Sequence, residues 1–160
     1  MLAEGEVAVM FKAIRRIVRA IDVRSREVAR AVGLTIPQIV VLQAAQALGA
    51  VTTKALSERA DLSSATVITI LDKLEEKGLV ERYRSTTDRR IVHTRVTERG
   101  ARVLADAPPL LHDEFNRALM ALPAGERGGL IEAITRIADM MDSRNLDAAP
   151  ILTTEVTPRS

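Results

Sequence analysis

Apolar residues recur at alternating steps of three and four along the N-terminal part of the chain, at Val7, Met10, Ile14, Ile17, Ile21 and Val28. Arg24 occupies the one position at which this repeat is interrupted. A stripe this narrow is typical of a helix that packs against another helix, as in a coiled coil. Because helices commonly end at glycine, the stripe and Gly33 predict a helix from about Glu4 to Val32.

Two shorter helices are predicted next. The first runs from Pro37 to Leu48, because proline is favoured in a first helical turn and a glycine follows Leu48. The second begins after a cap at Thr52 or Thr53 and ends near Ala60. A tight turn at 61–63 separates it from a further helix.

That fourth helix starts at a Ser63 or Ser64 cap and ends at Lys77-Gly78, a basic last turn followed by glycine. Its apolar stripe comprises Val67, Ile70, Leu71 and Leu74. If this stripe faces inward, the residues that face outward are Ala65, Ile68, Thr69, Asp72 and Lys73, with Thr66 at the border.

Two short strands with a polar loop between them follow, from Val80 to Arg84 and from Ile91 to Val96. Alternation places Val92, Thr94 and Val96 on one face of the second strand, with His93 and Arg95 on the other. This pattern predicts a β-hairpin.

The C-terminal part predicts two more helices. One starts at a Thr97 cap and reaches about Leu122, and Pro108-Pro109 should kink or divide it. The other spans about 124–141, and its apolar side comprises Leu130, Ile134, Ile137 and Met141. Residues 142–160 contain two prolines and are expected to form a loose tail.

Composition and charge refine this outline. The 160 residues are about one domain's worth, and 47% hydrophobic with 2% aromatic residues indicates a core of aliphatic side chains. The predicted fold class is mainly α with a small β-hairpin. The net charge is only +2, but residues 12–30 hold seven Lys or Arg against two acids, and residues 73–102 hold nine against five. Residues 103–160 are acidic, with five Arg against nine acids, so the molecule is polarised.

Several classes of function are disfavoured. The chain has no cysteine, and its only histidines are His93 and His112. No glycine-rich phosphate loop is present, and Asp113 and Glu114 beside His112 point to different helix faces, so neither an enzyme nor a metal or cofactor site is expected. The longest apolar tract, 36–51, contains three glutamines and falls short of the roughly 20 residues of a membrane span. A cytoplasmic protein without membrane contact is predicted.

The order of the middle elements points to double-stranded DNA. A short helix, a tight turn and a longer helix form a helix-turn-helix, whose second helix can enter the major groove. The residues expected to meet bases or phosphates there are Ser63, Ser64, Thr66, Ile68, Thr69 and Lys73. The alternative for this surface is an ordinary solvated helix face.

The basic hairpin that follows would form a wing beside this helix. Its candidate DNA contacts are Arg84, Asp88, Arg89 and Arg90. Asp88 can hold a neighbouring guanidinium in a fixed orientation, and an arginine so held suits a narrow minor groove. Arg90 is expected to be the arginine that reaches DNA and Arg89 an auxiliary charge. The alternatives are a solvated loop, or a winged-helix module that binds proteins instead of DNA.

The segments LDKLEEKGLVER (Leu71–Arg82) and DRRIVHTRVTERG (Asp88–Gly100) resemble the MarR family of bacterial winged helix-turn-helix regulators. The resemblance covers about residues 5–142, and Asp88 and Arg90 match the family's wing pair. Many members have Thr-Arg where this chain has Ile68-Thr69, so a base-reading or phosphate-binding arginine is absent there.

The resemblance implies one MarR-like domain, with dimerisation helices at 4–33 and 101–142, a winged helix-turn-helix at 34–100 and the tail at 143–160. It implies a homodimer that binds a pseudo-palindromic operator, usually as a repressor, and in many members a small-molecule effector that releases DNA. The absence of cysteine excludes the peroxide-sensing branch. The residues expected at the dimer interface are Val7, Met10, Ile14, Ile17, Leu130, Ile134, Ile137 and Met141.

Overall fold

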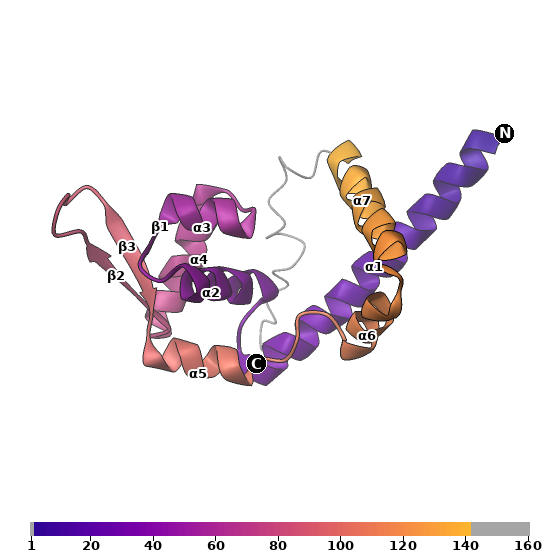
Figure 1. Cartoon of the computed structure of the whole chain (residues 1–160). Coiled ribbons are helices and arrows are strands. Elements are labelled where there is room, and N and C mark those ends of the chain that lie inside the picture. The colour runs from indigo at the N-terminus through magenta and orange to yellow at the C-terminus, as the bar shows by residue number, and fades with distance from the viewer. Residues whose placement is uncertain (1, 142–160) are drawn as a thin grey trace, which may run out of the picture.

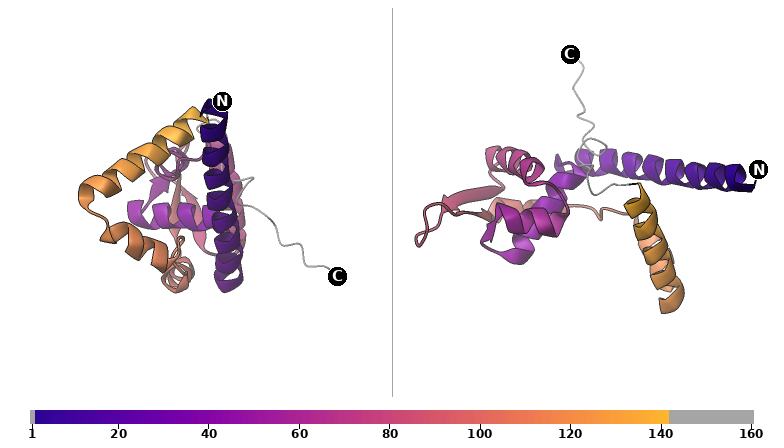
Figure 2. Two further views of the ribbon diagram at one scale, coloured as in Figure 1. Left: turned by 90° about the vertical axis from the view of Figure 1, so that its right-hand side faces the viewer. Right: turned by 90° about the horizontal axis from the view of Figure 1, so that it is seen from above.

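The computed structural model describes residues 2–141, with side chains from residue 4 onward. The elements are α1 (Leu2–Val32), α2 (Ile36–Leu48), β1 (Val51–Thr52), α3 (Thr53–Ala60), α4 (Ser64–Glu76), β2 (Val80–Arg84), β3 (Val92–Val96), α5 (Glu98–Asp106), α6 (Asp113–Ala121) and α7 (Ala124–Met140). Elements α2 to β3 form a lobe from which the β2–β3 hairpin projects, and α1 extends out of the lobe as a long rod (Figure 1). Helices α6 and α7 lie away from the lobe, on the side toward which α1 extends (Figure 2).

The hydrophobic core lies inside the lobe. Its buried apolar side chains come from α1 to β2, and all of them fall between residues 28 and 80. They are Val28, Leu34, Ile39, Val41, Leu42, Ala44, Ala45, Val51, Leu56, Val67, Ile70, Leu71, Leu74, Leu79 and Val80. The predicted inward stripe of α4 is therefore confirmed, since all four of its members belong to this core.

Side-chain caps fix where the lobe helices begin. Thr35 and Gln38 form a capping box, which starts α2 one residue earlier than the predicted Pro37. Thr52 caps α3, and its Oγ1 accepts a hydrogen bond from the Ala55 amide at 3.2 Å. Ser63 rather than Ser64 caps α4, and its Oγ accepts from the Thr66 amide at 3.2 Å.

The sheet has three strands where the sequence indicated two. Its order is β1-β3-β2, entirely antiparallel, and Val51 of β1 pairs with Thr94 of β3. A two-residue strand is too short to show alternation, so the sequence pattern did not reveal it. Strand β3 begins at Val92, one residue later than predicted, because the backbone of Ile91 closes the hairpin loop. The Ile91 amide donates to the Asp88 carbonyl, and the Ile91 carbonyl accepts from the Ser85 amide.

The prolines divide the predicted fifth helix. Helix α5 ends at Asp106 and α6 begins at Asp113, with Pro108-Pro109 in the connection, as expected for residues that cannot donate a helical hydrogen bond. The Arg24 guanidinium donates to the Pro109 carbonyl oxygen from Nε at 3.0 Å and from Nη2 at 2.6 Å. The Arg24 side chain is 14% exposed. The residue that interrupts the apolar stripe of α1 is therefore a partly buried arginine that attaches the connection between α5 and α6 to α1.

The turn from β3 into α5 is tightly packed around Gly100. The Thr97 hydroxyl donates to the Gly78 carbonyl at 2.7 Å and accepts from the Gly100 amide at 3.0 Å. A Cβ at Gly100 would overlap the Leu79 carbonyl oxygen and lie 2.8 Å from Val96 Cγ1. Glycine is therefore required here for a close approach of backbone to backbone.

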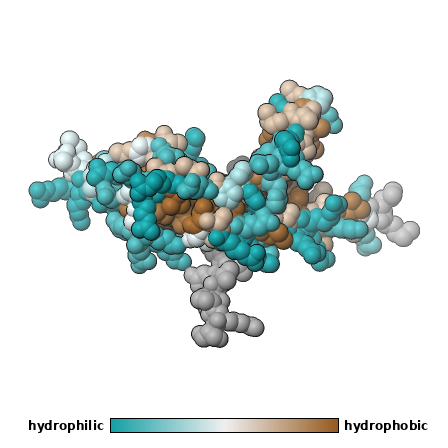
Figure 3. All heavy atoms as spheres, turned by 90° about the horizontal axis from the view of Figure 1, so that it is seen from below, coloured by the Kyte–Doolittle hydropathy of each residue, from teal (hydrophilic) through white to brown (hydrophobic). Residues whose placement is uncertain are grey.

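Outside the lobe, large apolar side chains remain exposed. In α1 they include Val7, Met10, Phe11, Ile17 and Val18, and in α6 and α7 they include Phe115, Met120, Leu130, Ile131, Ile134 and Met140. Figure 3 shows apolar patches uncovered on the face seen from below. A single protomer therefore leaves the apolar sides of these helices without cover.

Candidate nucleic-acid interface

Helix α4 presents a mixed surface to solvent. Its inward stripe is buried, whereas Ala65, Ile68, Thr69, Asp72 and Lys73 are exposed and Thr66 is half-buried at the border, as predicted. The Ile68 side chain is 46% exposed, an unusual position for a large aliphatic group on an otherwise polar helix face. The face thus offers methyl, hydroxyl and ammonium groups side by side, which are the groups that meet thymine methyls, base edges and phosphates.

Three hydroxyls of this face are held by hydrogen bonds within the helix and its cap. The Ser63 hydroxyl lies 3.0 Å from Thr66 Oγ1, and the Thr69 hydroxyl donates to the Ala65 carbonyl at 3.1 Å. These bonds restrict the rotamers of the three side chains. The helix therefore presents a preset pattern of oxygen atoms at its N-terminal end, the end that reads bases in helix-turn-helix proteins.

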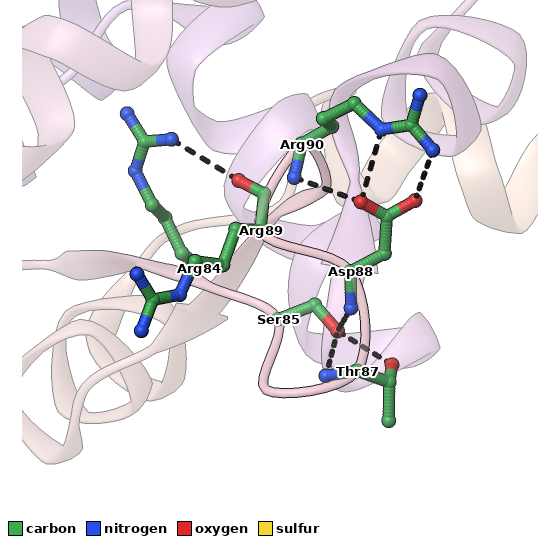
Figure 4. Close-up of polar contacts among 6 residues, drawn as sticks. All are labelled: Arg84, Ser85, Thr87, Asp88, Arg89 and Arg90. Carbon is green, nitrogen blue, oxygen red and sulfur yellow. Dashed lines mark hydrogen bonds and ion pairs between the residues drawn. The ribbon is translucent and has the colours of Figure 1, made fainter.

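The wing loop is closed by a small hydrogen-bond network (Figure 4). The Ser85 hydroxyl oxygen accepts from the Thr87 amide at 3.2 Å and from the Asp88 amide at 3.4 Å. Across the hairpin, Arg84 Nη1 donates to the Arg89 carbonyl at 3.1 Å. The loop tip is therefore an ordered turn, and one of its predicted contact residues, Arg84, contributes to that order.

Asp88 and Arg90 form a two-pronged pair at the tip. Asp88 Oδ1 accepts from the Arg90 amide at 3.0 Å and from Nε at 3.2 Å, and Oδ2 accepts from Nη2 at 3.3 Å. Hydrogen bonds from Arg90 lower the pKa of Asp88. The Arg90 side chain is 91% exposed, so the pair adds little stability but orients a guanidinium toward solvent.

The two adjacent arginines differ in geometry. Figure 4 shows the Arg89 side chain pointing away from Asp88, while Arg90 folds over that carboxylate. The expected organisation of Arg90 by Asp88 is thus present, and Arg89 is an exposed charge on the other side of the loop.

Sequence reasoning missed Arg82, which joins the wing to α4. Its Nη2 donates to Asp72 Oδ1 and to Glu75 Oε2, both at 2.6 Å, and its Nε donates to Glu75 Oε2 at 3.1 Å. The Glu75 carboxylate also accepts from the Arg82 amide at 3.3 Å. The only hint in the sequence is that Asp72 and Glu75 are acids three residues apart on α4. Their partner could not be predicted, because it depends on how β2 packs against that helix.

The outer face of the hairpin carries a separate cluster. The rings of Tyr83 and His93 lie 5.6 Å apart, the Arg95 guanidinium lies 5.3 Å from the Tyr83 ring, and Arg95 pairs with Glu81 at 2.8 Å. These residues pair directly across β2 and β3. The predicted sharing of a face by His93 and Arg95 is therefore confirmed, and this face is opposite to the one that holds Arg82 and Thr94.

Within residues 2–141, no group of three or more His, Asp or Glu side chains is arranged to hold a metal ion. In the same part of the chain, no single helix is long and apolar enough to cross a membrane, although the bent pair Glu4–Val32 and Ile36–Leu48 meets the length and composition criteria together.

Comparison with known proteins gives consistent matches. The sequence model of the MarR family matches residues 34–92, which run from the end of α1 to the start of β3. The uncharacterized HTH-type transcriptional regulator YsmB of Bacillus subtilis is 32% identical over 100 residues, which are 62% of this chain and 68% of that protein.

Solved structures give the same fold. The PcaV transcriptional regulator from Streptomyces coelicolor, in complex with its natural ligand, matches with a TM-score of 0.66 and 27% identity over 81% of this chain and 91% of its own. A mutant MarR from E. coli, complexed with operator DNA, also has a TM-score of 0.66, with 22% identity over 83% of this chain and 96% of its own. At that identity the second match shows the fold alone.

Proposed function

Because the chain belongs to the MarR family of DNA-binding transcriptional regulators, we propose that it is a homodimeric repressor of a pseudo-palindromic operator. The main support is the solvent-facing Arg90 guanidinium, held by Asp88 at the tip of a wing beside the exposed face of α4. A preorganised cation costs less conformational entropy to place on DNA than a freely rotating one.

In the proposed complex, α4 enters the major groove and the wing reaches the adjacent minor groove or backbone. The residues proposed to contact DNA from α4 and its cap are Ser63, Ser64, Thr66, Ile68, Thr69 and Lys73. From the wing they are Arg84, Asp88, Arg89 and Arg90, with Arg84 and Asp88 acting by holding the loop. Because Thr69 takes the place of an arginine found in many members, Ile68 and the hydroxyls carry base recognition in this chain.

The dimer is proposed to form through residues 4–33 and 101–142. Its support is the uncovered apolar surface of these helices in one protomer. Val7, Met10, Ile17, Leu130, Ile134 and Met141 are exposed, and Ile14 and Ile137 are half-buried. Burial of these rows against a second copy would contribute about 25 cal/mol for each Å² of apolar surface removed from water. The tail, 142–160, lies outside the described residues.

A small-molecule effector is also proposed, since PcaV is solved with its natural ligand. Release of DNA would follow if the effector binds better to a dimer whose two lobes are spaced incompatibly with the operator. An electrophoretic or fluorescence titration with candidate ligands tests this directly: an effector should weaken DNA affinity and raise the melting temperature of the free protein.

The primary test is binding to DNA from the gene's own upstream region across a salt series. We expect log Kd to rise steeply with log salt concentration, because Lys and Arg contacts release counterions. Arg90→Ala should weaken binding by roughly tenfold and reduce the salt slope by about one. Its free energy of unfolding should change by less than about 0.5 kcal/mol, since the side chain is exposed.

Arg95→Ala is the matched control, because Arg95 is also exposed, pairs with an acid and lies on the same hairpin but on the outer sheet face. It should retain most of the affinity. Absence of binding to the upstream DNA, or salt-independent binding, would instead favour the protein-binding module.

A further inference from the structure

Arg82 lies between the two surfaces proposed to contact DNA. It belongs to β2, the first strand of the wing, and its side chain reaches across to two carboxylates of α4. The side chain is 26% exposed, compared with 62% for Arg95 on the opposite sheet face. Among the described residues, it is the guanidinium that ties the hairpin to α4 through side-chain bonds to both Asp72 and Glu75.

The carboxylates that Arg82 holds are placed where uncompensated negative charge would be harmful to DNA binding. Asp72 is exposed on α4, three residues beyond Thr69 and adjacent to Lys73. At such a position an unpaired carboxylate would repel the phosphate backbone. The 2.6 Å contact with Arg82 draws that carboxylate toward the hairpin and offsets its charge.

We propose that Arg82 is a positioning residue for DNA recognition, which sets the orientation of α4 relative to the wing and neutralises Asp72 and Glu75 beside the DNA backbone. This role rests on the proposed function, since it requires that α4 and the wing bind one duplex together. The hydrogen bonds from Arg82 lower the pKa of Glu75, and those to Glu75 raise the pKa of Arg82, because each charge stabilises the other.

The geometry requires arginine in particular. Arg82 uses Nε and Nη2 on Glu75 and shares Nη2 with Asp72, an arrangement that a planar guanidinium can satisfy. A lysine ammonium is a single point charge on a flexible stem, so it would compensate charge without fixing the angle between the two elements. Arg82→Lys therefore separates neutralisation from orientation.

The first experiment compares DNA affinity of the full chain carrying Arg82→Gln, Arg82→Lys or Arg95→Gln. The Arg82→Gln and Arg95→Gln variants lose the same charge from the same hairpin, so a general loss of positive charge affects both. We expect Arg82→Gln to weaken operator binding by about five- to tenfold and Arg95→Gln by less than about twofold. Arg82→Lys should fall between them. Equal losses in the Arg82→Gln and Arg95→Gln proteins would overturn the proposed role.

A second variant isolates the electrostatic part. In the Arg82→Gln/Asp72→Asn protein one of the two carboxylates left unpaired on α4 is removed, so affinity should recover by about two- to threefold relative to Arg82→Gln alone. If the affinity does not recover, neutralisation of Asp72 is not part of the role of Arg82, and only its orientation of α4 relative to the wing remains.

The orientation can be measured without DNA. Because the chain has no cysteine, spin labels can be attached at Glu76→Cys in α4 and Thr86→Cys at the wing tip, with labelled chains diluted into unlabelled ones. The distance distribution should broaden in the Arg82→Gln background and stay narrow in the Arg95→Gln background. An unchanged distribution would overturn the positioning role even if DNA affinity falls. Failure of the unsubstituted protein to bind DNA would instead overturn the proposed function.

Discussion

The lobe differs from α6 and α7 in whether the apolar side chains are buried within one protomer. Between residues 28 and 80 the apolar side chains form a closed core, whereas α6 and α7 contain no buried residue. The N-termini of the helices differ too. Side chains cap the three lobe helices α2, α3 and α4, and also α5, which follows the wing, but no side chain caps α6 or α7. Within one protomer the lobe therefore closes around its own core, whereas α6 and α7 leave apolar side chains exposed.

The largest expected effect comes from placing a charge in the exposed apolar row of α7. Ile134→Glu leaves the lobe core untouched but would bury a carboxylate in the proposed dimer interface, which is strongly unfavourable for an unpaired charge. We expect the dimer to dissociate or aggregate in analytical ultracentrifugation and operator binding to fall by more than about a hundredfold.

Thr135→Glu is the control for that substitution, since it adds the same charge to the neighbouring exposed position on another face of α7. It should stay dimeric and bind DNA. If Ile134→Glu is an intact dimer, the proposed interface along α7 is wrong.

Inside the lobe, substitutions on two adjacent faces of α4 should have different effects: one should change the folding stability and the other DNA binding. Leu71 is fully buried and Ile68 is 46% exposed. Leu71→Ala should lower the free energy of unfolding by about 2–5 kcal/mol, because it leaves a cavity in the core. Ile68→Ala should cost less than about 0.5 kcal/mol of stability yet weaken operator binding. Denaturant unfolding and DNA titration of both variants provide the check; a reversed pattern would mean that Ile68 is a packing residue.

The smallest expected effect is on how the free energy of unfolding changes as the pH falls. Because Arg82 lowers the pKa of Glu75, the stability contributed by Glu75 is present at neutral pH and is lost as pH falls through its folded-state pKa. Its side chain is 41% exposed, so screening keeps the contribution below about 1 kcal/mol. Denaturation between about pH 7 and pH 3 should show a shallower decline for Glu75→Gln than for the unsubstituted protein. Identical slopes would rule out this contribution.

Local chemistry explains what the sequence could predict. The faces of α4 follow from helical period, and the Asp88–Arg90 pair involves residues two apart in one turn, so both are predictable from sequence alone. The Arg82 cluster joins residues seven and ten apart through the docking of β2 on α4, and the Arg24 bond to Pro109 joins residues 85 apart. Such contacts depend on tertiary packing and leave only faint local signals. The short β1 strand is invisible for the same reason, since it exists only through its pairing with β3.

The close approach at Gly100 also has a mechanical meaning. With Thr97 bonded to Gly78 and no space for a side chain beside the Leu79 carbonyl, the joint between β3 and α5 has little freedom to bend. A rotation of α5 would therefore also move the wing and α4, because the turn between β3 and α5 cannot bend to accommodate it. In a dimer, α5 would act as a stiff lever, and a small displacement at its distal end would change the separation of the two DNA-binding surfaces.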